Sequence, residues 1–401
     1  MRLRSRSPHL RRPSGRRVAA CAAGALAALA VVAPTAAAAN PFDRTGMWIW
    51  QLPKSSGGSL DRIGATAAQF GIGTVYVKSS DGQYFWRQFT PAMIAGMKAR
   101  GLRVCAWQYV YGDLPATEAA LGARAVTMGA DCLIIDAESE YEGRYAAADT
   151  YIRNLRAKIG NGYPLALAGF PYVDYHPSFP YSVFLGVNGA QYNLPQMYWK
   201  AIGTSVDKVF AHTYNYNRVY NRRIYPLGQT YDRPRPSQLV RFRQLAAGYR
   251  AKGVSWWDWQ ETTTAGFGAL GQKLAPLKFT PANAYPTLKR GSSGDLVVWA
   301  QQHLLTAGYA IAVDGRFGSG TQQAVVSFKA SRGLPATAIV DGPTWTALLR
   351  LAPAPVAWSQ RRRAGRAASA RGGGSAGASA PLSASQPPLR REIPPKPHTR
   401  G

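Results

Sequence analysis

The sequence predicts an α/β protein with a TIM-type (β/α)8 barrel, followed by a small all-α domain of three helices. Two observations predict the barrel. Short apolar runs alternate with amphipathic stretches along residues 45–265, and eight such repeats in about 220 residues match the usual size of this fold. The small domain is predicted by a second apolar helical pattern over residues 285–351, after a linker at residues 266–284.

The predicted strands are short runs rich in β-branched and aromatic residues, bounded by glycine, proline or charged residues. They are Met47–Trp50, Thr74–Lys78, Arg103–Tyr109, Cys132–Asp136, Pro164–Ala168, Gln191–Tyr198, Arg223–Gly228 and Gly253–Trp257. The amphipathic stretches between them predict helices. These include Thr90–Arg100, Pro115–Met128, Ala146–Ile159 and Pro236–Ala251. The sixth and seventh repeats are the least regular, because residues 188–225 are crowded with Tyr and Asn.

Both ends of the chain are predicted to lie outside the folded domains. Residues 1–39 have the pattern of a signal peptide: an Arg-rich start, an apolar Ala-rich stretch and small residues before Asn40. Residues 352–401 are rich in Pro, Ala, Ser, Gly and Arg, which predicts a disordered basic tail. We therefore expect a secreted, cell-wall-associated protein, exported by the general or the twin-arginine route. No segment of the mature chain is apolar enough for a membrane span.

The formal net charge of +28 suits an anionic envelope, and the basic tail could adhere to anionic wall polymers. Nucleic acid is the generic alternative for a basic chain, but no recognition motif is present and export argues against it. No metal-ligand spacing or cofactor motif occurs, so neither a metal nor a cofactor is expected. Cys105 and Cys132 begin consecutive predicted strands. A disulfide and two free buried thiols both remain open for this pair.

Three carboxylates at alternate positions end the fourth predicted strand: Asp136, Glu138 and Glu140. Alternate residues on a strand share a face, and active sites of α/β barrels form at the carboxyl ends of the strands. Paired carboxylates are the groups that cleave glycosidic bonds. Aromatic residues also recur at the strand ends, as expected for a site that packs against sugar rings. The sequence therefore predicts a carbohydrate site there.

The predicted barrel resembles two families of glycoside hydrolases, the chitinase-like family 18 and the lysozyme-like family 25. Three motifs carry the resemblance: Asp136-Ala-Glu138, Gln196-Met-Tyr198 and Gly253-Val-Ser-Trp-Trp257. The resemblance implies Glu138 as general acid, Asp136 as its orienting partner, Tyr198 as support for a substrate acetamido group and Trp257 as the floor of the sugar site. The further candidates for substrate binding are Trp48, Trp107, Gln196, Glu140 and Asp258.

Two departures from these families lie in the strands. Trp48 stands where family 25 lysozymes have an aspartate, and residues 133–135 lack the acids that chitinase-like barrels carry upstream on the fourth strand. They leave two alternatives. The chain is expected to be a glycoside hydrolase acting on an amino-sugar polymer, most simply peptidoglycan, as a muramidase or glucosaminidase would. Otherwise it is a non-catalytic wall-binding protein with a degenerate barrel. A protease or amidase lacks support, since no nucleophile elbow or zinc motif is present.

Residues 285–351 resemble the peptidoglycan-binding type 1 domain. The motifs are Lys289-Arg-Gly291, Gly308-Tyr309, Val313-Asp-Gly-Arg-Phe-Gly-Ser-Gly-Thr321 and Gly333-Leu-Pro335. The resemblance implies peptidoglycan as the partner. The candidate ligand contacts within these motifs are Tyr309, Asp314, Arg316 and Phe317.

Overall fold

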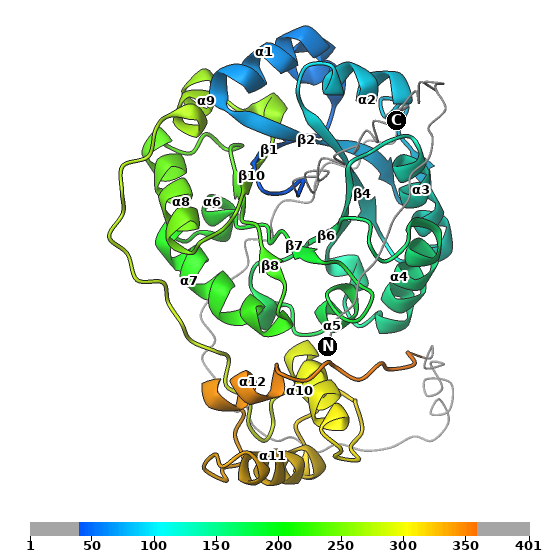
Figure 1. Ribbon diagram of the computed structural model, residues 1–401, viewed down its shortest axis with the longest axis vertical. Helices are drawn as coiled ribbons and strands as arrows, with labels where there is room; N and C mark the ends of the chain where they lie inside the picture. Colours follow the sequence, from blue (N-terminus) through cyan, green and yellow to red (C-terminus); the bar gives the residue numbers. More distant parts are fainter. Residues whose placement is uncertain (1–39, 359–401) are drawn as a thin grey trace, which may run out of the picture. The chain divides into compact units, whose positions relative to one another are not determined.

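A curled sheet of parallel strands, ringed by helices, occupies most of the chain (Figure 1). The structure is a computed structural model that describes residues 40–358; the predicted signal peptide and nearly all of the predicted tail lie outside the described residues. The strands that follow one another around the sheet are β1 (Thr45–Ile49), β2 (Ile72–Asp81), β4 (Arg103–Val110), β5 (Cys132–Ala137), β6 (Leu165–Ala168), β7 (Tyr192–Asn193), β8 (Arg223–Ile224), β9 (Leu227–Gln229) and β10 (Val254–Trp257). A short β3 (Tyr84–Phe85) pairs antiparallel with β2. The predicted TIM-type barrel is confirmed.

The sixth and seventh predicted strands are shorter and more broken than expected. The sixth is reduced to β7, after which only Gln196 pairs again, in a bridge to Leu227. The seventh is split into β8 and β9 around Pro226. Proline has no N–H to give to a strand ladder, so Pro195 and Pro226 interrupt the regular pairing at these places. The bridge between Gln196 and Leu227 still completes the ring, because Leu227 begins β9, β9 pairs with β10, and β10 pairs with β1.

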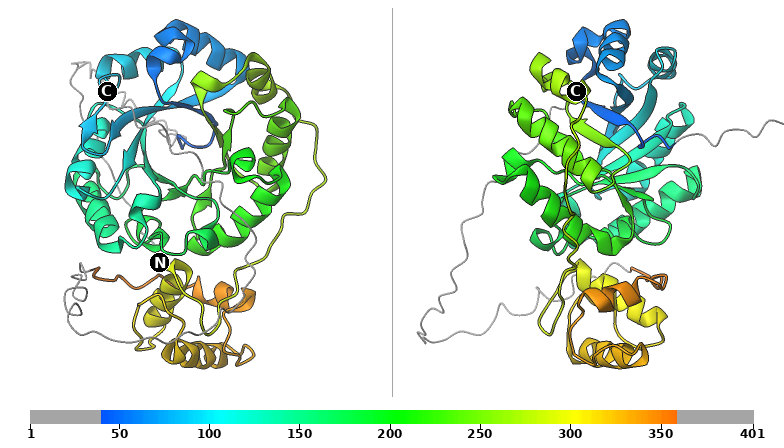
Figure 2. Two further views of the ribbon diagram at one scale, coloured as in Figure 1. Left: turned by 180° about the vertical axis from the view of Figure 1, so that it is seen from behind. Right: turned by 60° about the vertical axis from the view of Figure 1, so that its left-hand side comes forward.

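Helices connect the strands and cover the outside of the sheet, which the side view in Figure 2 shows. Thr90 illustrates how one begins: its side chain accepts from Met93 N, and Pro91 occupies the first helical position, where no N–H is needed. The barrel helices are α1 (Leu60–Phe70), α2 (Pro91–Lys98), α3 (Pro115–Thr127), α4 (Tyr145–Ile159), α5 (Tyr181–Phe184), α6 (Trp199–Ile202), α7 (Val206–Asn217), α8 (Pro236–Gly248) and α9 (Thr264–Gly271).

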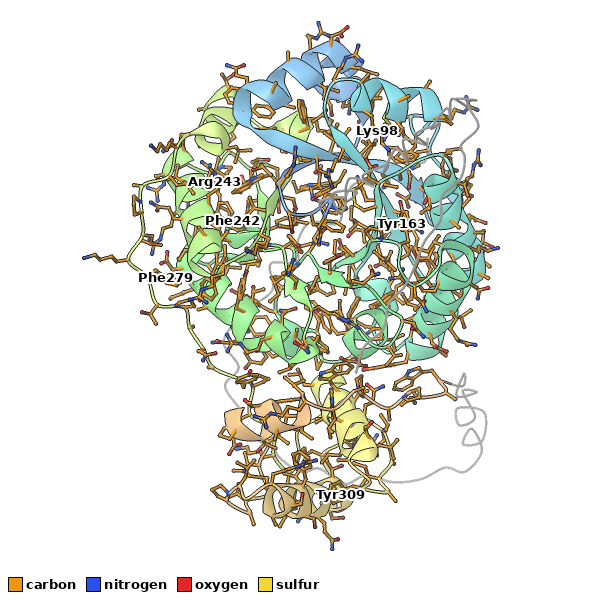
Figure 3. The ribbon with its side chains drawn as sticks, viewed as in Figure 1. Lys98, Tyr163, Phe242, Arg243, Phe279 and Tyr309 are labelled. Atoms are coloured by element: carbon orange, nitrogen blue, oxygen red, sulfur yellow. A yellow bond between two sulfur atoms is a disulfide. The ribbon has the colours of Figure 1, made fainter. Side chains whose placement is uncertain are left out.

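Strand alternation divides the buried residues into two clusters. On β5, Leu133 and Ile135 pack outward against helices, whereas Cys132 and Ile134 pack into the barrel interior. The outer cluster includes Phe242 of α8, labelled in Figure 3, which packs against Trp256 of β10. This alternation places Asp136 on the inner face, in line with Cys132 and Ile134.

Cys105 and Cys132 form a disulfide between neighbouring parallel strands. The strand register pairs these two residues directly, with their Cα atoms 4.6 Å apart. That separation lies within the range a disulfide requires. Of the two alternatives left by the sequence, the structure therefore has the disulfide.

After α9 the chain runs without regular structure to α10 (Asp295–Thr306), α11 (Ser319–Ser331) and α12 (Gly342–Leu348). Trp345 of α12 is fully buried, and its indole N–H donates to Pro286 O at 2.7 Å. Asp295 is also buried and accepts bonds from Ser182 of α5 and from Tyr220. The residues that the structure describes belong to a single compact unit. No helix among them is long and apolar enough to cross a membrane.

Candidate functional site at the carboxyl ends of the strands

Asp136 and Glu138 lie where β5 ends, at the predicted place. Asp136 is fully buried on the inner face of the barrel, and Glu138, two residues on, is partly exposed. Glu138 directly follows the last residue of β5 and precedes the short 3-10 helix η3 (Ser139–Tyr141), and its carboxylate shares the amide of Gln196 with Asp136. The side chain of Glu138 therefore continues the inner face of β5 to the surface of the barrel mouth.

Gln196 joins the two carboxylates. Its side-chain Nε2 donates to Asp136 Oδ1 at 3.0 Å and to Glu138 Oε1 at 3.0 Å. An amide nitrogen carries two hydrogens, so both bonds form at once. Because both oxygens lie 3.0 Å from one nitrogen, they are at most about 6 Å apart, which places two carboxylates close enough to act on one bond. The predicted residues Asp136, Glu138 and Gln196 are thus brought together.

Tyr198 places a buried hydroxyl beside this pair. Its ring meets Tyr231 edge-on, and its hydroxyl has no hydrogen-bond partner among the described residues. Burial, and next the neighbouring Tyr231, Asp136 and Glu138, hold the pKa of Tyr198 well above its ordinary value. The hydroxyl therefore stays protonated at neutral pH and can donate a hydrogen bond to a bound molecule.

Glu140 accepts hydrogen bonds from a tyrosine of the neighbouring strand β4. The hydroxyl of Tyr109 lies 3.0 Å from Glu140 Oε1 and 2.9 Å from Oε2. Burial, followed by the charges of Glu138, Asp136 and Glu140, raises the pKa of Tyr109, so this phenol also stays protonated. Tyr109 lies on the inner face of β4, a position the sequence signalled only as one of several aromatic residues at the strand ends.

The predicted tryptophans differ in depth. Trp48 and Trp107 are 1% and 0% exposed and pack against each other inside the barrel, below the carboxylates. Both indoles are part of the barrel packing in this structure, and their contact with substrate remains a prediction. Trp257 is 6% exposed and packs on both of them, and partly exposed Trp50 stacks on it. The aromatic surface at the mouth is therefore formed by Trp50 and Trp257.

Asp258 is fully buried, and its Oδ1 accepts from Glu261 N at the start of the 3-10 helix η6 (Trp259–Glu261). The peptide bond between Trp257 and Asp258 is cis. The hydrogen bond from Glu261 N to Asp258 Oδ1 caps η6 and fixes the loop after β10, and the predicted role of Asp258 in substrate binding remains a prediction.

A further polar cluster, not predicted from the sequence, lies at the carboxyl end of β2. Lys78 Nζ is 2.5 Å from Asp81 Oδ2, and Tyr111 donates to Asp81 Oδ1 at 2.8 Å. The ammonium also lies over the rings of Trp86 and Trp107. The available signal was a lysine that ends an apolar strand run and is followed by Ser-Ser-Asp. Within residues 40–358, no group of three or more His, Cys, Asp or Glu side chains is placed to hold a metal.

The four candidates in the C-terminal helices are not equally accessible. Asp314 and Arg316 are exposed, and Tyr309 packs partly buried against Phe328 of α11 (Figure 3). Phe317 is 2% exposed and belongs to the helical core. Phe317 therefore packs in this core, and ligand contact by each of the four residues remains a prediction.

Several known proteins resemble parts of this chain. A peptidoglycan-binding protein from Clostridioides difficile is 42% identical over 16% of this chain and 41% of its own length, with a TM-score of 0.16. A chitinase from Chromobacterium violaceum is 12% identical over 57% of this chain and 97% of its own, with a TM-score of 0.46. An endo-β-1,4-mannanase from Thermotoga petrophila is 9% identical over 55% and 68%, with a TM-score of 0.43.

The chain thus spans about two fifths of the Clostridioides difficile protein. Among curated proteins, none matches this sequence. One family matches a segment of the chain: residues 293–348 fit the family described as "Putative peptidoglycan binding domain". This segment contains α10, α11 and α12, in agreement with the motifs of the sequence. The helical C-terminal part of the chain is therefore a peptidoglycan-binding domain.

Proposed function

We propose that the barrel is a glycoside hydrolase that acts on an amino-sugar polymer, peptidoglycan in the first place, as a muramidase or glucosaminidase would. One observation carries the proposal. Partly exposed Glu138 is fixed beside buried Asp136 through the amide of Gln196, at the carboxyl end of the barrel strands. An acid that reaches the surface and a carboxylate held beneath it are the groups that glycosidic cleavage needs.

Glu138 is the proton donor in this mechanism. Its side chain is the part of the pair that a bound glycan can reach, so it would protonate the oxygen of the leaving sugar. Asp136 is out of reach of solvent, and it orients Glu138 through Gln196 and supplies negative charge as positive charge develops on the sugar ring.

The remaining residues of the mouth would position the sugar. The protonated hydroxyl of Tyr198 suits the carbonyl oxygen of an N-acetyl group. This hydroxyl is a buried hydrogen-bond donor that has no acceptor among the described residues. Trp257, with Trp50 stacked on it, offers an apolar face to the sugar ring. The hydroxyl of Tyr198 favours an N-acetylated amino sugar over an unmodified hexose, whereas the indole face suits either sugar.

The peptidoglycan-binding domain supports the cell wall as the place of action. A domain that binds the polymer raises the concentration of substrate that the barrel meets. Export is supported by the pattern of residues 1–39 and by the Cys105–Cys132 disulfide, since disulfides persist mainly outside the reducing cytosol.

A second candidate function is a barrel that binds wall glycans without cleaving them. It is favoured by the position of Trp48, which fills the inner face of β1 with a buried indole where the lysozyme-like family has an acid. Asp136 and Glu138 then come from one strand alone, and no described residue of β1 adds a third carboxylate.

The two functions separate in a single experiment. The chain without residues 1–39 and its Glu138→Gln variant are incubated with purified peptidoglycan, and released muropeptides are measured by mass spectrometry. We expect products from the wild type and a loss of about a hundredfold or more in the variant, as removal of a general acid commonly causes. Both proteins should still sediment with the peptidoglycan.

The matched control is Glu142→Gln, four residues further along the same loop. Glu142 holds His176 and Ser178 and makes no contact with Gln196, so this variant should keep its turnover. Release of muropeptides by Glu138→Gln at the wild-type rate would exclude Glu138 as the acid. If neither protein releases products while both sediment with the wall, the binding function replaces the catalytic one.

A further inference from the structure

The peptidoglycan-binding domain carries a surface pocket that none of the candidate ligand contacts lines. It has a volume of about 480 Å³ and lies between the end of α11 and one face of α12. Volumes of roughly 300–1,000 Å³ are usual for sites that enclose a small molecule. Tyr309, Asp314 and Arg316, the candidates from the sequence motifs, do not line it.

The helical period of α12 explains why one of its faces stays open. Trp345 and Leu348 turn into the core and are fully buried. Pro343, Ala347 and Arg350, spaced four and three residues apart, fall on another face and line the pocket. Pro343 and Ala347 are small apolar side chains, and Arg350 adds a positive charge to the lining.

Two arginines give the pocket its charge. Arg332 follows α11 and Arg350 follows α12, and both are exposed. Neither makes an ion pair within residues 40–358, in contrast to Arg100, Arg144, Arg153 and Arg241 of the barrel. The guanidinium of Arg332 lies over the ring of Phe328, 5.3 Å from its centre, which restricts where it can point. The pocket thus combines two available cations with an apolar wall formed by Leu334 and Ala347.

We propose that this pocket binds the carboxylate-bearing peptide stem of peptidoglycan. Guanidinium groups recognise carboxylates through paired hydrogen bonds, and the apolar wall suits the methyl side chains of alanine residues next to such a carboxylate. The polymer is indicated by the family of the domain, and the peptide is its part that carries both methyl groups and free carboxylates. The proposal rests on this domain and does not require the barrel to be a glycosidase.

A direct binding experiment tests the proposal. The chain without residues 1–39 is titrated by calorimetry with a synthetic muramyl pentapeptide that ends in a free carboxylate, and separately with the same peptide as its C-terminal amide. We expect the Arg332→Gln/Arg350→Gln variant to bind the free acid at least tenfold more weakly than the wild type, because charge-assisted bonds are lost. The wild type should bind the amide about as weakly as the variant binds the acid.

The matched control variant is Arg290→Gln, an exposed arginine within residues 285–351 that neither lines the pocket nor belongs to the candidate ligand contacts. It should bind the acid as the wild type does. Equal thermal unfolding midpoints would show that all three proteins are folded, as expected for substitutions at exposed positions. Release of sugar from a soluble amino-sugar oligomer should be the same in all three, whatever its rate, which separates this site from the barrel.

Three results would overturn the proposal. The first is no binding of the free acid by the wild type, and the second is equal affinity in the wild type and the double variant. The third is preferential binding of polyglycerol phosphate, with no difference between the peptide acid and its amide. That third result would assign the pocket to the phosphate groups of an anionic wall polymer.

Discussion

The side-chain amide of Gln196 donates a hydrogen bond to Glu138 Oε1 at 3.0 Å, although 58 residues separate the two in the chain. The position of Gln196 depends on an irregular strand. Pro195 interrupts the pairing after β7, and Gln196 then makes one isolated bridge to Leu227. Its side chain is 2% exposed and faces the barrel interior, where it meets both acids. A break in the sheet thus places the one amide that joins the carboxylates.

We first predict the effect of Gln196→Leu. The change removes the shared donor of Asp136 and Glu138, so the free energy of unfolding at neutral pH should fall by about 1–3 kcal/mol. Turnover of peptidoglycan should fall at least tenfold, because Glu138 loses the group that orients it. Urea denaturation and muropeptide release measure the two effects. Exposed Gln272 provides the control, since Gln272→Leu should change neither. Unchanged turnover in Gln196→Leu would argue against the orienting role.

The second prediction concerns the unpartnered hydroxyl of Tyr198. Because it has no hydrogen-bond partner among the described residues, Tyr198→Phe leaves no bonded group unsatisfied. Stability should therefore change by less than about 0.5 kcal/mol. The kcat/KM for an N-acetylated glycan should fall about tenfold to a hundredfold, whereas that for the same glycan after de-N-acetylation should hardly change.

Tyr214 offers a close control for Tyr198. Its hydroxyl is also buried without a partner, and it lies on α7 among Phe210 and Tyr249, outside the mouth. Tyr214→Phe should leave turnover of both glycans unchanged. If Tyr198→Phe lowers kcat/KM equally for both glycans, the hydroxyl of Tyr198 does not recognise the acetamido group.

The alternation along β5 shows how far sequence alone reaches. Spacing by two correctly placed Asp136 and Glu138 on one face at the end of a strand, and the Gln196-Met-Tyr198 motif brought its two polar residues to the same place. The spacing of residues along a strand could not predict how deeply each side chain is buried in the barrel. Trp48 and Trp107 face inward as expected, but they lie below the opening, because barrel width and the size of neighbouring side chains decide what a ligand reaches.

The register between neighbouring strands likewise could not be predicted from the sequence. Cys105 and Cys132 stand at the start of consecutive strands, yet a shift by one residue would have turned one sulfur to the outer face. The broken seventh strand shows a related limit. Pro226 was visible in the sequence. The residue at which strand pairing resumes, however, depends on the pairing of Leu227 with both Gln196 and Ser255.

The third prediction is a loss of stability on removing the disulfide. Cys105 and Cys132 are 27 residues apart, and closing a loop of that length stabilises a fold by roughly 3–4 kcal/mol through the unfolded chain. The Cys105→Ser/Cys132→Ser variant should lose about that amount in chemical denaturation. A reducing agent should lower the unfolding midpoint of the wild type and leave the variant unaffected. Equal stability of wild type and variant under oxidising conditions would contradict the prediction.

The last prediction concerns Asp295, the first residue of α10. Its carboxylate is fully buried and accepts from Ser182 N at 2.9 Å, Ser182 Oγ at 2.6 Å and the hydroxyl of Tyr220 at 2.8 Å. Burial raises the pKa of Asp295 from 3.8 to about 6, and the hydrogen bonds from Ser182, Tyr220 and Tyr145 offset part of the rise. The folded protein therefore holds this proton more tightly than the unfolded chain does.

A raised pKa fixes the sign of the pH dependence. The contribution of Asp295 to stability is fully present below its unfolded pKa, near 3.8, and is lost as the pH rises through about 6. A shift of this size corresponds to about 3 kcal/mol. Urea denaturation of the wild type and of Asp295→Asn between pH 4 and pH 7.5 measures it. The stability of the wild type relative to the variant should fall across this window. If the difference is constant or rises with pH, Asp295 is ionised in the fold at pH 4, and the hydrogen bonds from Ser182 and Tyr220 outweigh its burial.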